Sequence, residues 1–342
     1  MLMPLHTPLF QSLCRPLRSS IGTCALLVAI CAATLAPVST SRADTDKPQP
    51  VVCMLPVSND NPRAQVTVRH AATNAKAQNA KLVVHNEKHN SLDEQFATFK
   101  KMVGSDCDAI ILEPHRPSAV TPAFAQLINQ TITGGIPVVS ILSDVKGANF
   151  TSHITIDPLS VGDHLARATC KRVTSGDTVF HLFPHYRNAD IEAMEKSAIK
   201  EFNMQVSHQC PGVKFINIES QHPRDVAPAI QAQLNKGEKP ALIVTDHPLA
   251  LTEIIAALKS RYQGSTNNIK LVGFDASPAA VRALKEGTVD SLVVAKYKQY
   301  SEQGVIAAVL GTQQINLGKI HVPLTEMTQK NVDDYKEFYG TH

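Results

Sequence analysis

The sequence lacks the short motifs that mark several classes of enzyme. It contains no G-x-S-x-G segment, which would place a nucleophilic serine on a tight turn, and no glycine-rich loop of the P-loop type. Gly134 and Gly135 precede Pro137 at a predicted strand start, which is the wrong edge of a parallel sheet for binding phosphate. We therefore expect no enzymatic activity and no cofactor.

Metal-binding patterns are also missing, although the chain has 14 histidines and seven cysteines. It has no H-E-x-x-H motif and no clustered Cys/His spacing. His85 and His89 are four residues apart, but they follow a predicted strand in a polar loop. His181 and His185 flank a strand end and point in different directions. We expect no metal site.

An excess of charge of one sign is missing as well. The formal net charge is +3, and three arginines lie within residues 1–43, so the rest of the chain is neutral. A neutral chain has no basic field to attract nucleic acid. Nucleic acid is therefore not an expected partner.

Residues 1–43 contain no Asp or Glu and include an uncharged apolar run over 21–38. Small residues at the −3 and −1 positions predict cleavage of a secretory signal after Ala43. The alternative is an uncleaved anchor, since the run approaches the ~20 residues of a bilayer span. Neither Cys24 nor Cys31 follows the small residue of a lipoprotein signal, so we expect a soluble exported protein.

Four cysteines remain after such cleavage: Cys53, Cys107, Cys170 and Cys210. We expect buried thiols, because a chain of this length needs no covalent staples. An oxidising compartment also permits two disulfides, and four cysteines allow three pairings. If bonds form, Cys53–Cys107 and Cys170–Cys210 are the expected pairs. The first two cysteines stand near the starts of neighbouring predicted strands, and the other two follow predicted helices.

From residue 51 onward, short apolar runs alternate with amphipathic segments of helical length. Strands are predicted at 51–56, 81–85, 108–112, 136–141, 153–157, 177–183, 212–219, 241–245, 270–275 and 291–296. Helices are predicted near 62–79, 91–103, 118–132, 158–173, 188–205, 224–236, 248–262, 277–286 and 299–314. This alternation predicts an α/β fold with parallel sheets that are covered on both faces.

The predicted helix starts share one device, a proline preceded by a polar residue. The polar residues are Asn61, Asp157, His222, His247 and Ser277. Ser91 and Glu94 add a capping-box pattern before another helix. In a parallel sheet such junctions converge on the edge where ligands bind. The alternative is that capping alone explains each residue.

The ordered segments VSNDNP (57–62), IPVVSI (136–141), SHITIDPLSVGDHLA (152–166), VTDHPLALTEIIAALK (244–259) and LVGFDASPAAVRALKEGTVDSLVVAKY (271–297) resemble the ribose-type periplasmic sugar-binding proteins. The resemblance covers about 51–325. It implies the type I periplasmic binding protein fold, in which two Rossmann-like lobes are joined by a three-segment hinge. On this numbering the lobes would be 48–153 plus 297–322, and 154–296 plus 323–342.

The resemblance also implies ligand-binding residues at the strand ends. A carboxylate accepts two hydroxyl hydrogen bonds in a fixed plane, and Asp275 is the foremost candidate, with capping as its alternative. Asn61 aligns with an amide at the first strand–helix junction of the family. Asp246 stands where family members often have Asn or Asp, and Asp144 lies near the family's Asp-Arg pair.

Departures from the family bear on the ligand. Arg63 and Ala64 stand where sugar-stacking aromatic residues are usual, Glu195 replaces an Arg, and Gln221 and His222 replace a second-lobe aromatic. The chain has no Trp, and aromatic residues are only 5%. A simple pentose or hexose is therefore in doubt.

The predicted strand-end loops are instead rich in cationic and imidazole side chains. They are Arg63, His115, Arg116, His185, Tyr186, Arg187, His222, His247 and Lys296, where Tyr186 stands between two of them. Arginine suits carboxylate or phosphate, so an acidic sugar is one hypothesis for the ligand. The alternative is that most are solvated rim residues.

The family's role implies a monomer in the periplasm that delivers its ligand to the membrane permease of an ABC transporter. Relatives of this fold also present ligands to membrane histidine kinases or chemoreceptors, and the sequence leaves both roles open. A transcription factor with this fold would need a DNA-binding headpiece before the first strand. The predicted signal occupies that part of the chain.

Overall fold

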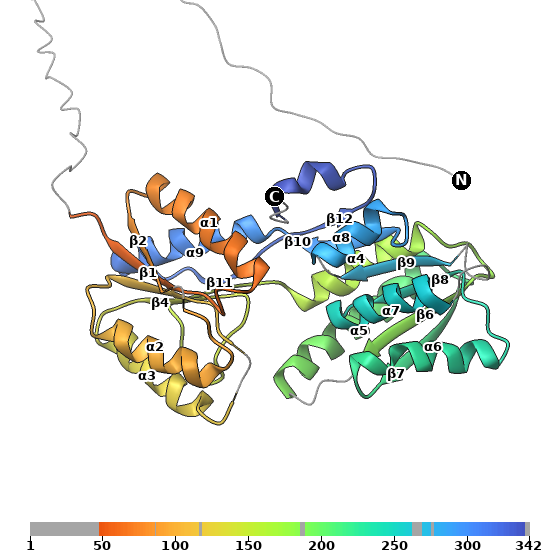
Figure 1. The fold of residues 1–342 in the computed structure, drawn as a ribbon, viewed down its shortest axis with the longest axis horizontal. Helices are drawn as coiled ribbons and strands as arrows, with labels where there is room; N and C mark the ends of the chain where they lie inside the picture. Colours follow the sequence, from red (N-terminus) through yellow and green to blue (C-terminus); the bar gives the residue numbers. More distant parts are fainter. Residues whose placement is uncertain are drawn as a thin grey trace, which may run out of the picture. The chain divides into compact units, whose positions relative to one another are not determined.

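Two six-stranded sheets form the framework of the chain (Figure 1). The computed structural model describes residues 48–85, 87–115, 118–184, 189–261, 269–274 and 277–338. The chain passes between the sheets three times, after β5, after β10 and after β11. The predicted α/β fold of two lobes is confirmed, while the exact lobe boundaries stay a prediction.

The first sheet is parallel throughout and has the order β2-β1-β3-β4-β5-β11. Its strands are β1 (Val51–Leu55), β2 (Lys81–Val84), β3 (Ala109–Leu112), β4 (Val138–Ile141), β5 (Ser152–Thr155) and β11 (Gly318–His321). One face is covered by α1 (Pro62–Ala77) and α9 (Tyr297–Thr312), the other by α2 (Leu92–Val103) and α3 (Thr121–Thr133) (Figure 1).

Side chains of the first sheet alternate between two cores, as strand geometry requires. Val52 and Met54 belong to the core under α1 and α9, whereas Leu55 belongs to the core under α2 and α3. Because both faces are covered, the strands are continuously apolar. This explains why the apolar runs located β1 to β5 in the sequence, whereas the edge strand β11 was missed.

The second sheet has the order β7-β6-β8-β9-β10-β12. Its strands are β6 (Thr178–Pro184), β7 (Lys214–Ser220), β8 (Leu242–Thr245), β9 (Lys270–Phe274), β10 (Ser291–Ala295) and β12 (Leu324–Met327). The last of them, β12, runs antiparallel to β10. The prediction of purely parallel sheets is wrong at this strand, which reaches β10 without a crossover helix.

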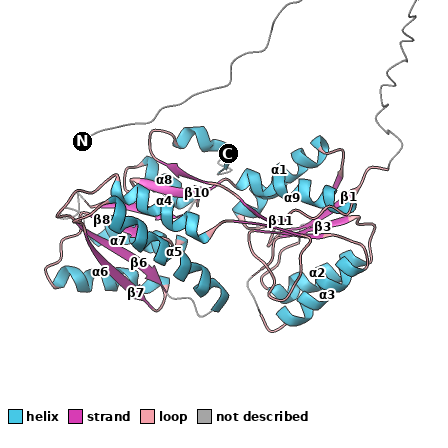
Figure 2. Cartoon of the chain, turned by 180° about the vertical axis from the view of Figure 1, so that it is seen from behind, coloured by secondary structure: helices cyan, strands magenta, loops and turns pink. Residues whose placement is uncertain are grey.

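Helices cover both faces of the second sheet (Figure 2). They are α4 (Pro158–Cys170), α5 (Ala189–Gln209), α6 (Val226–Asn235), α7 (Pro248–Arg261) and α8 (Pro278–Lys285), with short 3-10 helices at Pro223–Asp225 and Val332–Phe338. Gly162 allows α4 and α5 to pack closely. A Cβ atom there would lie 2.8 Å from the Phe202 backbone nitrogen.

The predicted capping residues start the helices as expected. The side chain of Asn61 accepts from the backbone amides of Arg63 (2.9 Å) and Ala64 (3.3 Å), and Ser277 accepts from that of Ala280 (3.2 Å). Asp157 caps α4 in the same way. At α2, Ser91 caps the Glu94 amide, but the Glu94 carboxylate binds the backbone amide of Asn90 instead of completing the box with Ser91.

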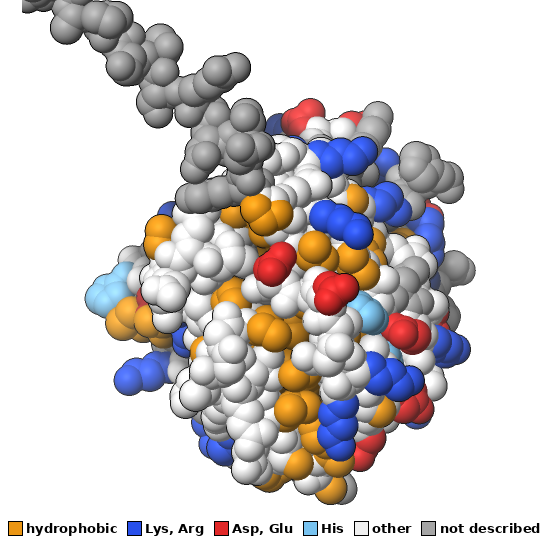
Figure 3. Space-filling model, turned by 90° about the vertical axis from the view of Figure 1, so that its left-hand side faces the viewer, with side chains coloured by type: hydrophobic (Ala, Val, Ile, Leu, Met, Phe, Trp, Pro, Cys, Tyr) orange, Lys and Arg blue, Asp and Glu red, His pale blue; other side chains and the backbone are white. Residues whose placement is uncertain are grey.

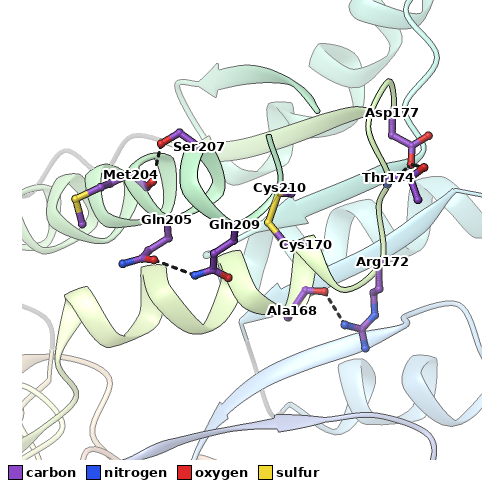
Figure 4. Close-up of a disulfide and its surroundings, with 10 residues drawn as sticks. All are labelled: Ala168, Cys170, Arg172, Thr174, Asp177, Met204, Gln205, Ser207, Gln209 and Cys210. Atoms are coloured by element: carbon purple, nitrogen blue, oxygen red, sulfur yellow. Dashed lines mark hydrogen bonds between the residues drawn. A yellow bond between two sulfur atoms is a disulfide. The ribbon is translucent and has the colours of Figure 1, made fainter. Parts of the chain in front are cut away.

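Both expected cysteine pairs are disulfides, so the prediction of buried thiols is wrong. Cys53 on β1 is bonded to Cys107 just before β3, with 5.7 Å between their Cα atoms. Cys170 at the end of α4 is bonded to Cys210 just after α5, with a Cα separation of 5.4 Å (Figure 4). A chain of this length does not need disulfide bonds to fold, but each lobe nevertheless has one.

Lys and Arg side chains are interspersed with Asp and Glu on the face drawn in Figure 3, with hydrophobic side chains between them. Within the described ranges, no helix is long and apolar enough to cross a membrane. The predicted signal in residues 1–43 lies outside the described residues.

Candidate functional site

A buried glutamine organises the carboxyl edge of the first sheet. The Gln95 side-chain amide donates to the backbone oxygens of Pro56 (3.1 Å) and Glu113 (2.7 Å). Its oxygen accepts from the backbone amide of His115 at 2.8 Å. Gln95 is completely buried, so these bonds fix the segments that follow β1 and β3.

The segments after β1 and β2 are joined as well. The backbone amide of His89 donates to Ser58 Oγ at 3.2 Å, and that hydroxyl donates to Asp60 Oδ1 at 2.6 Å. Lys88 forms an ion pair with Asp60 at 3.0 Å. Three strand-end segments are therefore held in one hydrogen-bonded frame.

An ion pair with one buried and one exposed partner stands at this edge. Arg63, in the first turn of α1, places Nη2 3.1 Å from Oε1 of Glu113, which directly follows β3. The Glu113 side chain is 1% exposed, whereas that of Arg63 is 41% exposed. Burial raises the pKa of Glu113, and Arg63 and the Val57 backbone act in the opposite direction. The buried Glu113 thus pairs with one side of the Arg63 guanidinium, and the other side of the Arg63 side chain stays accessible to solvent.

Glu113 was not predicted from the sequence. It has the same local signal as the predicted residues, a carboxylate directly after the apolar run AIIL and before a proline. What the sequence did not indicate is its partner, because Arg63 is 50 residues away along the chain.

Two tyrosines of α9 lie close to this pair. The rings of Tyr297 and Tyr300 are stacked, with centroids 5.9 Å apart. Burial raises the pKa of Tyr300 well above its ordinary value, and Tyr297 adds to the shift. Burial lowers the pKa of Arg63, and Glu113 with the two tyrosines acts to raise it.

The other predicted first-lobe residues have different positions. The Asn61 side-chain oxygen is engaged in capping α1. His115 is partly buried, with its backbone fixed by Gln95. Asp144 is exposed after β4 and acts on His153, whose pKa is lowered by burial while Asp144 opposes the shift.

Two histidines at the carboxyl edge of the second sheet cap the helices that follow them. His222 Nδ1 accepts from the backbone amide of Arg224 at 3.1 Å. Nδ1 of the buried His247 accepts from the amides of Leu249 (3.0 Å) and Ala250 (3.2 Å). In both, Nδ1 serves as an acceptor, so each ring is unprotonated at that atom. Capping accounts for the positions of these two residues.

Asp246 directly follows β8 and is partly buried. Burial raises its pKa from 3.8 to about 7, against an opposing backbone hydrogen bond. Gln221 is exposed after β7, and Lys296 is partly buried between β10 and α9. His185 and Asp275 lie outside the described residues, as do Arg116, Tyr186, Arg187 and the Glu195 side chain. Ligand contact by any of these stays a prediction.

His181 is a buried core residue. It is fully buried in the middle of β6 against the Phe202 ring, at a centroid distance of 4.2 Å. Neither of its ring nitrogens has a hydrogen-bond partner of normal geometry among the described residues. Burial lowers its pKa from 6.5 to about 4, although Asn217 on the neighbouring strand opposes the shift.

The structure brings three potential metal ligands together, although the sequence has no clustered Cys/His spacing. Ligand atoms of Cys53, Cys107 and His85 lie within 4.8 Å of one another. The two sulfurs are bonded to each other, so in this state they are not thiolate ligands.

The comparisons with known proteins agree with this architecture. Residues 52–318 match the family model described as a periplasmic binding protein domain. A search of curated protein sequences gave no match.

Solved structures of binding proteins share the fold. AraP, an arabinose binding protein from Geobacillus stearothermophilus, is 15% identical with a TM-score of 0.74, over 84% of this chain and 99% of that chain. An ABC transporter solute binding protein from Bacillus halodurans C-125 with bound myo-inositol is 18% identical with a TM-score of 0.65, over 86% of this chain and 100% of that chain. A XylFII-LytSN complex is 15% identical with a TM-score of 0.61, over 83% and 99%.

Proposed function

Because this chain belongs to the periplasmic binding protein family, we propose that it is an exported, non-enzymatic solute-binding protein. It captures a sugar or sugar derivative in a cleft between its lobes and delivers it to the permease of an ABC importer. Cleavage of the signal after Ala43 would release it into the periplasm.

The observation that carries this proposal is the frame of strand-end segments around Gln95. Ligands of open parallel sheets bind outside the carboxyl ends of the strands, where this frame holds Glu113 and Arg63. A site with rigid donors and acceptors loses little entropy on binding. Solved proteins of this fold include one that binds arabinose and one with bound myo-inositol, which supports a polyhydroxylated ligand.

The proposed mechanism is a population shift. Asn61, Arg63, Glu113, His115 and Asp144 would contact the ligand from the first lobe. The second lobe would contribute from the set His185, Gln221, His222, Asp246, Asp275 and Lys296. A ligand that bridges both sets stabilises a closed state, which the membrane partner recognises.

A sensing role is the second candidate. The fold is shared with XylFII, whose solved complex with LytSN shows that a protein of this fold assembles with a partner chain. Ligand capture and closure would be the same, but the receiver would be a membrane histidine kinase or chemoreceptor. Neighbouring genes for an ATPase and a permease would favour transport, and a neighbouring histidine kinase gene would favour sensing.

Thermal-shift screening of the mature protein against sugars, sugar acids and sugar phosphates tests the binding function. A ligand at 100 times its Kd stabilises the folded state by about 2.7 kcal/mol, which is several degrees in Tm for a chain of this size. Stabilisation by none of these compounds would overturn the proposal. Asp275→Ala is the companion variant, and a ligand effect that survives it would remove Asp275 from the site.

A further inference from the structure

The Arg63–Glu113 pair places a buried carboxylate at the carboxyl edge of the first sheet. Oε1 of Glu113 binds Arg63, but the buried Oε2 has no hydrogen-bond partner of normal geometry among the described residues, although the Val57 backbone acts to lower the pKa of this carboxyl. A buried carboxylate oxygen without a donor is costly, and such groups in native proteins require an explanation. A bound molecule that donates a hydrogen bond to Oε2 would explain this atom. The position of Glu113 at the carboxyl edge of the sheet, where ligands of parallel sheets bind, agrees with that explanation.

The charge of this pair restricts the donor. A cationic ligand that approaches Oε2 also approaches the Arg63 guanidinium, and an anionic ligand that approaches Arg63 meets the Glu113 carboxylate. The pair therefore offers one donor group and one acceptor atom with little net field. Hydroxyl groups, which both donate and accept, match this combination.

The positive charge of other basic residues at this edge is also small, as Lys88 and His89 illustrate. Lys88 is paired with Asp60 at 3.0 Å, and burial lowers the pKa of His89, which favours the neutral ring. Lys88 and His89 therefore add little positive charge beside Arg63 that would attract a carboxylate or phosphate. Tyr300 is buried and stacks on Tyr297, so neither adds a positive charge here.

We propose that Arg63 and Glu113 form a charge-compensated subsite that binds neighbouring hydroxyl groups of an uncharged sugar or polyol. Glu113 Oε2 accepts from one hydroxyl, and the accessible side of Arg63 donates to the next oxygen. Gln95 is a positioning residue, because it binds the backbone oxygen of Glu113 and the backbone amide of His115. This inference rests on the proposed sugar-binding function and replaces the acidic sugar suggested by the cationic residues of the sequence.

The test is a calorimetric panel in which each neutral sugar or polyol is measured beside its carboxylic acid and its phosphate. The mature wild-type protein should bind the neutral member at least 10-fold more tightly than either charged analogue. Equal or tighter binding of a charged analogue would overturn the subsite while leaving the sugar-binding function intact. Binding of no compound in any class would overturn both.

Two variants and a matched control test whether the preference for a neutral ligand depends on Arg63 and Glu113. Glu113→Gln keeps the size of the side chain but removes the compensating charge. It should weaken binding of the neutral sugar at least 10-fold and narrow the gap to the charged analogue. Glu87→Gln removes an exposed carboxylate from the same edge and should change affinity less than 2-fold.

Arg63→Met should also weaken binding of the neutral ligand at least 10-fold, because it removes the guanidinium donor. Unchanged affinity in both site variants, with Tm values that show folded protein, would remove the pair from the site. If a variant fails to fold, the wild-type panel alone decides between uncharged and charged ligands.

Discussion

At the carboxyl edge of the first sheet, polar side chains have partners from other elements, as Gln95 and the Arg63–Glu113 pair illustrate. At the second sheet, the described histidines cap the helix that follows them. At the same edge, burial raises the pKa of Asp246 to about 7. The difference teaches that the junctions of the first lobe add a long-range frame to local caps such as Asn61, whereas the described histidines at the second sheet's edge serve as local caps.

The largest expected effect tests whether the lobes depend equally on their disulfides. Replacing Cys53 and Cys107 by Ala opens a loop with a sequence separation of 54, and replacing Cys170 and Cys210 opens one of 40. Loop entropy predicts a loss of about 4 kcal/mol of unfolding free energy in each case. Urea denaturation measures both. A loss below about 1 kcal/mol in one variant would show that the two lobes are held differently.

Replacing Gln95 by Leu breaks the first-lobe frame. The substitution leaves two backbone oxygens and one amide without their buried partner, so we expect a loss of about 3 kcal/mol. The control is Gln209→Ala, which changes an exposed glutamine of the second lobe and should stay within about 0.5 kcal/mol. Equal urea midpoints for the two variants would contradict the frame.

His181→Phe tests the cost of an unpartnered group in the second lobe. The folded pKa of about 4 lies below the ordinary 6.5, so the unfolded chain binds more protons between these pH values. Stability should therefore fall by ~2–3 kcal/mol as the pH drops from 6.5 to 4, and the variant should lose most of this dependence.

At neutral pH the same variant should gain ~1 kcal/mol, because two nitrogens without partners are removed. Denaturation curves at pH 7, 5 and 4 measure both effects. His208→Gln, an exposed histidine of α5, is the control and should keep the wild-type slope. A slope unchanged in His181→Phe would assign the acid sensitivity to other groups.

The smallest effect separates capping from ligand binding at Asn61. Asn61→Ala should lower stability by about 1 kcal/mol through loss of the α1 cap, as Ser277→Ala should at α8. Asn61→Asp keeps the capping oxygen but loses the amide donor. Sugar affinity unchanged in Asn61→Asp would show that the side chain is only a cap.

The sequence predicted the elements whose signal lies within a few neighbouring residues, namely strands and helix starts. Covered strands are continuously apolar, and the proline after Asn61 or Ser277 marks a helix start, so ten strands and nine helices were located to within a few residues. The resemblance supplied their arrangement into two lobes. Strands β11 and β12 were missed because each lies at the edge of its sheet, where side chains such as Lys319 are exposed and no apolar run is needed.

The site was predictable only in part. Asn61 and His222 were identified as junction residues, but their side chains cap helices, which the sequence left as an alternative. Glu113 was missed because its partner Arg63 is 50 positions away, and the two cysteine pairs were named correctly although buried thiols were expected for a chain of this length. Pairing at that range depends on the tertiary fold, which local patterns do not specify.

The last strands of the two sheets are almost adjacent in the chain. Strand β11 ends at His321 and β12 begins at Leu324, yet the two complete different lobes. A chain that is synthesised from its N-terminus cannot complete either sheet until this segment has been made. Both sheets then gain their final edge strand from neighbouring residues, which couples the completion of the two lobes.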